Sequence, residues 1–142
     1  SATTPPSRQA GAHLSSMIFM LMAKRERDRS KGGGDAPTSS FGSEWKCSRL
    51  AGYVGISGPF NLTLLKEHLI AQGMDLNGMV DEIFENDLTS FSPSSLARGD
   101  AYHRHASVTK LFPSVLLMHG TADNTVPEDQ AHDFGGSKIE FY

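Results

Sequence analysis

Cysteine is almost absent from this chain of 142 residues, which carries Cys47 alone. A single thiol excludes an internal disulfide framework and a metal site built from several cysteines, and it leaves the redox compartment undecided. An excess of basic charge is also missing, because the chain has 13 Lys and Arg residues but 16 Asp and Glu residues, and its net charge is −3. This balance gives no indication of binding to nucleic acid or to an anionic membrane surface.

A long hydrophobic run is missing as well. The most apolar window covers residues 10–23 and contains a histidine and two serines, so it falls short of the roughly 20 apolar residues that span a bilayer. We therefore expect a buried helix of a soluble domain, which starts near Gly11 and ends within residues 24–29, where cations suit the helix dipole. Any membrane anchor would have to lie outside the chain as given.

Two segments lack the periodicity of a helix or a strand. Ser1–Arg8 is rich in Pro, Ser and Thr and lacks the basic flank and apolar core of a signal peptide, so we expect it to be irregular. Residues 31–43 contain three consecutive glycines and a proline, which predicts a surface loop. The remaining length leaves room for one domain with a hydrophobic core.

Two short apolar runs, Leu50–Ser57 and Ser114–Met118, predict strands. A helix between them is expected to begin after an N-cap at Asn61 and to end at Gly73. The other expected elements are short: a helix at 79–85, a helix near 128–134 and a strand starting at Lys138. This order of helices and strands describes part of a doubly wound, mostly parallel sheet.

The segment from Ser114 to Pro127 is the most informative part of the chain. Ser114–Met118 is an uninterrupted run that suits a strand buried on both faces of a parallel sheet. His119 and Gly120 end the run, and Asp123 follows on a polar turn. A carboxylate at this position lies at the carboxyl edge of the sheet, where open α/β sheets place their sites. An isolated Asp here would more often cap a turn or the following helix.

Three segments together resemble one known family. The first is Ala10-Gly11-Ala12-His13, the second runs from Trp45 through 51–62 to Phe91-Ser92-Pro93, and the third is 119–127, which reads His-Gly-Thr-Ala-Asp-Asn-Thr-Val-Pro. They are similar to the plant-type isoprenylcysteine α-carbonyl methylesterases, which are serine carboxylesterases close to kynurenine formamidases. The resemblance covers residues 9–142 and implies a partial α/β-hydrolase fold that lacks the N-terminal strands and the segment with the catalytic histidine.

The resemblance also implies a role for individual residues. Such an esterase uses a serine on a strained strand-to-helix turn, an acid and a histidine, in the chain order Ser, Asp, His. Asp123 matches the triad acid, and Ala10 matches the residue whose backbone N–H forms part of the oxyanion hole. The nucleophile position is occupied by Gln9, where the family has serine, and the histidine is expected beyond Tyr142. The chain as written is therefore expected to be inactive.

The implied reaction is hydrolysis of the carboxyl methyl ester of a prenylated cysteine, either as a small molecule or at the C-terminus of a prenylated protein. The resemblance implies no metal, no cofactor and no nucleic acid, and it implies the endoplasmic reticulum or Golgi membrane as location. Two alternatives stay open. One is a kynurenine formamidase-like or general carboxylesterase, and the other is a non-catalytic truncated product.

Other residues could in principle replace the missing groups, but their positions argue against it. Ser7 is two positions from the nucleophile slot, in a segment with no strand signal. His13 is expected to pack at the start of the helix, and His132 is expected on the surface of a later helix. The remaining candidates are Ser15 and Ser16, expected to bond to the preceding turn, and Asp100, His103 and His105, expected to be solvated polar residues rather than metal ligands.

Overall fold

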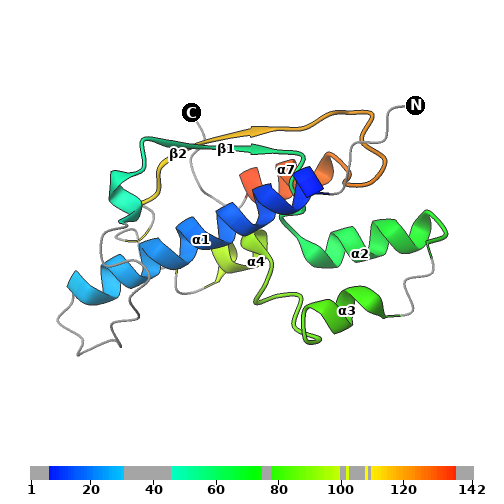
Figure 1. Cartoon of the computed structure of the whole chain (residues 1–142), viewed down its shortest axis with the longest axis horizontal. Coiled ribbons are helices and arrows are strands. Elements are labelled where there is room, and N and C mark those ends of the chain that lie inside the picture. The colour runs from blue at the N-terminus through cyan, green and yellow to red at the C-terminus, as the bar shows by residue number, and fades with distance from the viewer. Residues whose placement is uncertain are drawn as a thin grey trace.

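The structure, a computed structural model, describes residues 7–30, 46–74, 78–99, 102, 108 and 110–136. Its elements follow one another along the chain (Figure 1). They are α1 (Ser7–Ser30), the 3-10 turn η1 (Cys47–Arg49), β1 (Gly52–Ile56), α2 (Leu62–Ala71), α3 (Met79–Ile83), α4 (Pro93–Arg98), β2 (Ser114–Met118) and α7 (Asp129–Gly135). The result is a small α/β domain.

The two predicted strands are neighbours in one parallel sheet. Tyr53 of β1 is the register partner of Val115 of β2, and the pairing runs over the full length of both strands. The prediction of adjacent parallel strands is therefore confirmed. β2 has the expected bounds, whereas β1 is shorter than the apolar run 50–57 that predicted it.

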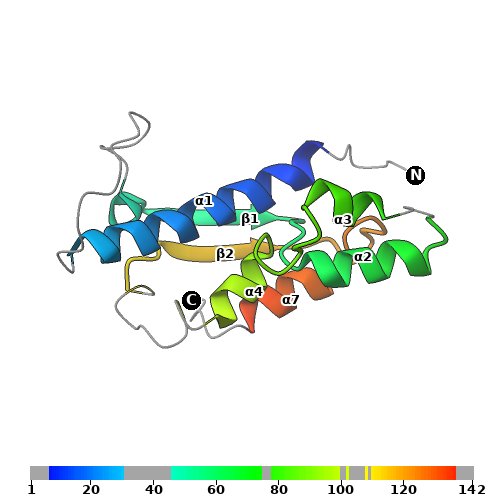
Figure 2. The same ribbon diagram turned by 90° about the horizontal axis from the view of Figure 1, so that it is seen from below.

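All labelled helices lie on one side of the sheet, as two perpendicular views show (Figures 1 and 2). The inward residue Val115 is buried, but Leu116 and Met118 on the same strand are about half exposed. The prediction that Ser114–Met118 is buried on both faces is therefore wrong. Within the described residues, helices do not cover both faces of the sheet, as a doubly wound sheet would require. Alternate side chains of a strand point to opposite faces, and only one of these faces is covered here.

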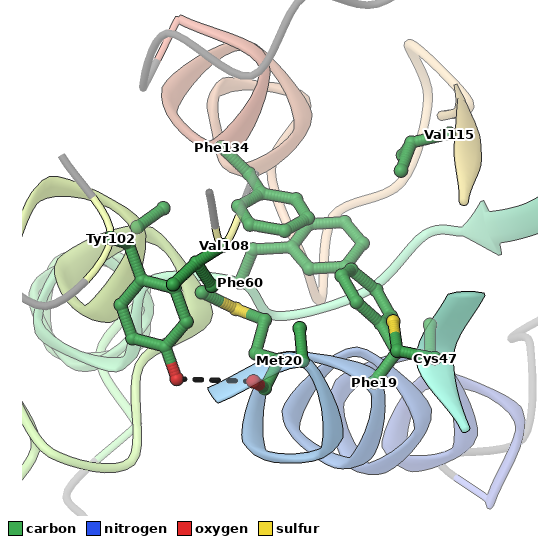
Figure 3. Packing of buried hydrophobic residues seen from close by; sticks show 11 residues of the cluster. Phe19, Met20, Cys47, Phe60, Tyr102, Val108, Val115 and Phe134 are labelled. Atoms are coloured by element: carbon green, nitrogen blue, oxygen red, sulfur yellow. Dashed lines mark hydrogen bonds between the residues drawn. The ribbon is translucent and has the colours of Figure 1, made fainter. Parts of the chain in front are cut away.

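The hydrophobic core lies between the sheet and the helices (Figure 3). Phe60 stacks on Phe134 of α7 at a ring-centroid distance of 4.8 Å, and Phe19 of α1 packs against Tyr53 of β1 at 4.9 Å. The Tyr102 hydroxyl donates to the Met20 carbonyl over 3.2 Å. Aromatic contacts thus join α1 to β1, and the segment that follows β1 to α7.

Helix α1 begins and ends outside the limits that the sequence predicted. It starts at Ser7 instead of near Gly11 and continues to Ser30, with Arg27 and Arg29 in its last turn. Ser1–Arg8 was expected to be irregular. Its last two residues are helical instead, and residues 1–6 lie outside the described part. No glycine or proline follows Gly11 before residue 30, so the sequence offers no helix breaker within that span.

The ends of α2 follow the sequence signals closely. The Asn61 side chain accepts hydrogen bonds from the backbone N–H groups of Thr63 and Leu64, so Asn61 is the N-cap as predicted. Gly73 has a positive φ of 74°, and the N–H of Met74 donates to the carbonyl of Leu69. This is the Schellman arrangement in which glycine ends a helix.

The remaining predictions divide between confirmed elements and residues outside the described part. α3 lies within the predicted helix 79–85, and α7 starts one residue later than expected. The loop at 31–43, the strand starting at Lys138 and the group of Asp100, His103 and His105 lie outside the described residues. None of the described helices is long and apolar enough to cross a membrane.

Candidate active site

The parts of the chain that the sequence singled out meet at one end of the molecule. In both views, the amino end of α1 and the loop that follows β2 lie at the end toward which the two strands point (Figures 1 and 2). Parallel strands place their carboxyl ends at one edge of a sheet, and open α/β sheets bind ligands outside that edge. The arrangement therefore brings the predicted acid loop and the predicted nucleophile position to the same edge.

Asp123 is held by the turn that it begins. Its Oδ1 accepts hydrogen bonds from the N–H groups of Thr125 and Val126, both over 3.0 Å, and its own N–H donates to the Gly120 carbonyl. Only 12% of its side chain is exposed. The carboxylate thus serves as a turn cap, the ordinary role of Asp in a loop, and at the same time it is fixed in orientation at the sheet edge.

His119 lies directly beneath this turn. Its Nε2 is 2.7 Å from the Val126 carbonyl oxygen and 3.9 Å from Oδ2 of Asp123, and 5% of its side chain is exposed. A nitrogen that faces a carbonyl oxygen must carry the proton, so we assign the neutral ring as the Nε2–H tautomer. From the sequence, His119 was placed at the end of an apolar run and within the family-like segment 119–127 but was given no role, although its position four residues before Asp123 was a usable signal.

A second histidine touches the same loop from another element. Nε2 of His68, on α2, lies 2.9 Å from the carbonyl oxygen of Asn124, and this contact is exposed. Val126 on the same loop is buried with 2% of its surface exposed. His68 was not predicted from the sequence, because the spacing of residues along α2 does not indicate which loop the histidine contacts.

The nucleophile position has a geometry that differs from the one the resemblance implies. Gln9 and Ala10 are the third and fourth residues of the regular helix α1, whereas the resemblance implies a strained turn between a strand and a helix. The first N–H groups of a helix have no partner within it, and Ala10 is at this end and exposed. As the fourth residue of α1, Ala10 lies where the i→i−4 hydrogen bonds of a helix begin, so the regular helix does not leave its N–H as an open donor.

The other histidine and serine candidates have structural partners. His13 is buried with Nε2 2.7 Å from the Phe91 carbonyl oxygen; burial lowers its pKa, and the bond to Phe91 partly opposes this. The Ser16 hydroxyl is buried and donates to the His13 carbonyl. Ser15 donates to the Gly11 carbonyl as predicted, although it is exposed. His132 is exposed on α7, as predicted.

The fold and the edge loop define a small α/β domain that carries a partly buried, oriented carboxylate after a parallel strand. The chain is similar to the probable isoprenylcysteine α-carbonyl methylesterases ICMEL1 of Oryza sativa subsp. japonica, at 31% identity, and ICMEL2 of Arabidopsis thaliana, at 30%. It is also similar to the isoprenylcysteine α-carbonyl methylesterase ICME of Arabidopsis thaliana, at 27%. Each match covers 89% of this chain.

The resemblance read from the sequence is thereby confirmed, and it is a resemblance to part of those proteins. The chain spans about a quarter of the length of these relatives, since each match covers 27% of them. No protein-family profile and no solved structure matches the chain significantly.

Proposed function

We propose that this chain corresponds to the acid-loop portion of an α/β-hydrolase-type serine carboxylesterase whose substrates are prenylcysteine methyl esters. The observation that carries the proposal is the similarity to proteins named as isoprenylcysteine methylesterases over 89% of the chain. The Asp123 turn at the carboxyl edge of a parallel pair supports it, because the acid of such an enzyme occupies a loop of this kind.

In this proposal, Asp123 is the acid that holds a catalytic histidine in the correct tautomer and stabilises its imidazolium form. The N–H of Ala10 supplies part of the oxyanion hole. The serine and the histidine would come from segments outside the chain, because Gln9 occupies the nucleophile position and carries a carboxamide, which cannot form the alkoxide. The complete reaction would acylate serine with release of methanol, and water would then release the prenylcysteine acid.

The chain by itself is therefore expected to have no esterase activity above background. Removal of a triad member from a serine hydrolase costs on the order of 10⁴ to 10⁶ in turnover, and the losses do not add because the members act as a unit. The purified chain should leave a p-nitrophenyl ester and farnesylcysteine methyl ester intact. Turnover that a serine-directed phosphonate blocks would show that the nucleophile has been misplaced.

A chimera tests the positive part of the proposal. Residues 10–136 of this chain would replace the matched segment of the full-length rice relative, which would provide the serine and the histidine. We expect the chimera to hydrolyse farnesylcysteine methyl ester, and Asp123→Asn to lower kcat/KM by on the order of 10⁴. Asp129→Asn is the matched control, because Asp129 is exposed on α7 and undergoes the same chemical change.

The chimera also separates the alternatives. Preferred hydrolysis of N-formylkynurenine or of short-chain esters would indicate the formamidase-like or general carboxylesterase reading. A folded chimera without any activity would instead support the non-catalytic reading. Residence at the endoplasmic reticulum or Golgi membrane stays part of the proposal and requires localisation of the full-length protein.

A further inference from the structure

The backbone N–H and the backbone carbonyl of Val126 both have side-chain partners. Its N–H donates to Oδ1 of Asp123 over 3.0 Å, and its carbonyl oxygen lies 2.7 Å from Nε2 of His119. The backbone of Val126, through the N–H of one peptide unit and the carbonyl of the next, thus connects the carboxylate of the acid loop to a ring at the end of β2. Displacement of this residue's backbone would move the carboxylate, because the two N–H groups that donate to Oδ1 come from neighbouring residues of the same short turn.

The ring of His119 is itself fixed to the sheet. Met118, the preceding residue, is the register partner of Ile56, and its carbonyl accepts the N–H of Ser57 over 2.9 Å. The side chain of His119 is 95% buried, with 5% exposed. The hydrogen bond to Val126 is therefore anchored in the sheet, whereas the turn it supports lies on the surface.

We propose that His119 is the positioning residue of the acid loop, which sets the orientation of the Asp123 carboxylate through the backbone of Val126. This inference rests on the proposed function, since a set orientation matters only if Asp123 is the triad acid. The ring acts as an N–H donor through Nε2. Nε2 also lies 3.9 Å from Oδ2 of Asp123, so the donor is close to the carboxylate that it orients.

The other histidine of the loop provides the comparison. His68 also contacts a loop carbonyl, that of Asn124 over 2.9 Å, but the contact is exposed and Asn124 gives no N–H to the carboxylate in the described bonds. Water can replace an exposed hydrogen bond at little cost. The structure therefore distinguishes a histidine that orients Asp123 from one that only touches the same loop.

The experiment measures amide hydrogen exchange at single residues in the 142-residue chain, without any substrate. His119→Phe keeps an aromatic ring but removes the donor, and it should accelerate exchange of the Val126 amide roughly fivefold to tenfold, with Leu117 of β2 unchanged. His119→Gln keeps an N–H donor at about the same distance from the backbone and should restore protection. His68→Phe should leave Val126 unchanged.

A spectroscopic measurement on the unmodified chain accompanies the exchange data. The imidazole ¹⁵N spectrum should show a protonated Nε2 for His119, and an Nε2 without a proton would overturn the proposal. It would also be overturned by an unprotected Val126 amide in the unmodified chain, or by equal acceleration at Leu117 and Val126. An inactive chimera would contradict the proposed esterase function but would not change the exchange and spectroscopic results. Failure of the proposed function and failure of this inference are therefore distinguishable.

Discussion

Val54 of β1 and Leu116 of β2 are register partners whose side chains both point away from the helices, and their exposed fractions are 56% and 52%. Ile56 and Met118, the next partners on this face, are exposed to a similar extent. Two neighbouring strands thus present a continuous apolar surface, a feature that makes proteins associate. Within the described residues no further strand pairs with the outer edges of β1 and β2, and unpaired backbone groups there add to this hazard.

We expect the chain to be poorly soluble and the double variant Val54→Glu, Leu116→Lys to be more soluble. The substitutions place opposite charges on partners that face solvent, so they remove apolar surface without disturbing the core. Size-exclusion chromatography and the soluble fraction after expression measure the effect. Val115→Lys is the control, because Val115 points into the core and a charge there should prevent folding. An unmodified chain that stays fully soluble and elutes as a monomer would contradict the prediction.

Asp133 should make stability depend on pH. Burial raises its pKa, but hydrogen bonds from Arg98 and Asn61 outweigh burial and lower the pKa below its usual range. A carboxyl with a lowered pKa in the folded state stabilises the fold above its unfolded pKa of about 4, and this stabilisation disappears as the pH falls through the folded value.

Asp133→Asn should therefore lower the urea midpoint at pH 7, and the difference from the unmodified chain should shrink below about pH 4. Because Arg98 is partly exposed, solvent weakens its share of the effect. Asp129→Asn, on the exposed side of the same helix, should show no such pH dependence. A constant difference at all pH values would indicate a packing defect instead of a titration effect.

The stacked pair of Phe60 and Phe134 should dominate the stability of the core. Both rings are fully buried, and truncation of a buried phenylalanine to alanine costs about 3–5 kcal/mol. Phe134→Ala should lower the free energy of unfolding by this amount, as measured by urea denaturation. Ile83→Ala is the control, because Ile83 is exposed on α3 and surface substitutions cost about 0.5 kcal/mol or less. Similar losses for both variants would contradict the assignment of the core.

Cys47 should react slowly with alkylating reagents in the folded chain. Burial, with a smaller contribution from the charge of Glu26, raises the pKa of its thiol to about 11. Only the thiolate reacts, so at pH 8 the folded chain should be alkylated on the order of 10² times more slowly than a free thiol with a pKa near 8.5. Mass spectrometry after iodoacetamide treatment measures the rate, and denatured chain is the reference. Equal rates in both states would show that Cys47 is exposed.

The sequence predicted the features that local chemistry decides. Ser114–Met118 is followed by His-Gly, and its apolar run has the length of a strand. The first and last residues of this strand could therefore be predicted. Asn61 and Gly73 end α2 through their own side chain and backbone. In each case the residues that determine the structure are neighbours in the sequence.

The features that distant residues decide could not be predicted. The same apolar run leaves open whether helices cover one face or two, and the exposure of Leu116 shows that the second face is uncovered here. The bond of His119 to Val126 depends on how the turn folds back over the ring. The contact between Asn61 and Asp133 joins residues 72 positions apart, and no local pattern indicates it.

The parallel pairing of β1 and β2 also has a kinetic consequence. The chain must pass through α2, α3 and α4 before Tyr53 meets Val115, and closing such a long loop costs entropy before the sheet returns any stabilisation. The hydrogen bonds of helix α1 join residues four positions apart and can form within microseconds. The sheet should therefore assemble last, and a newly made chain would spend the time before that step with both strand edges open.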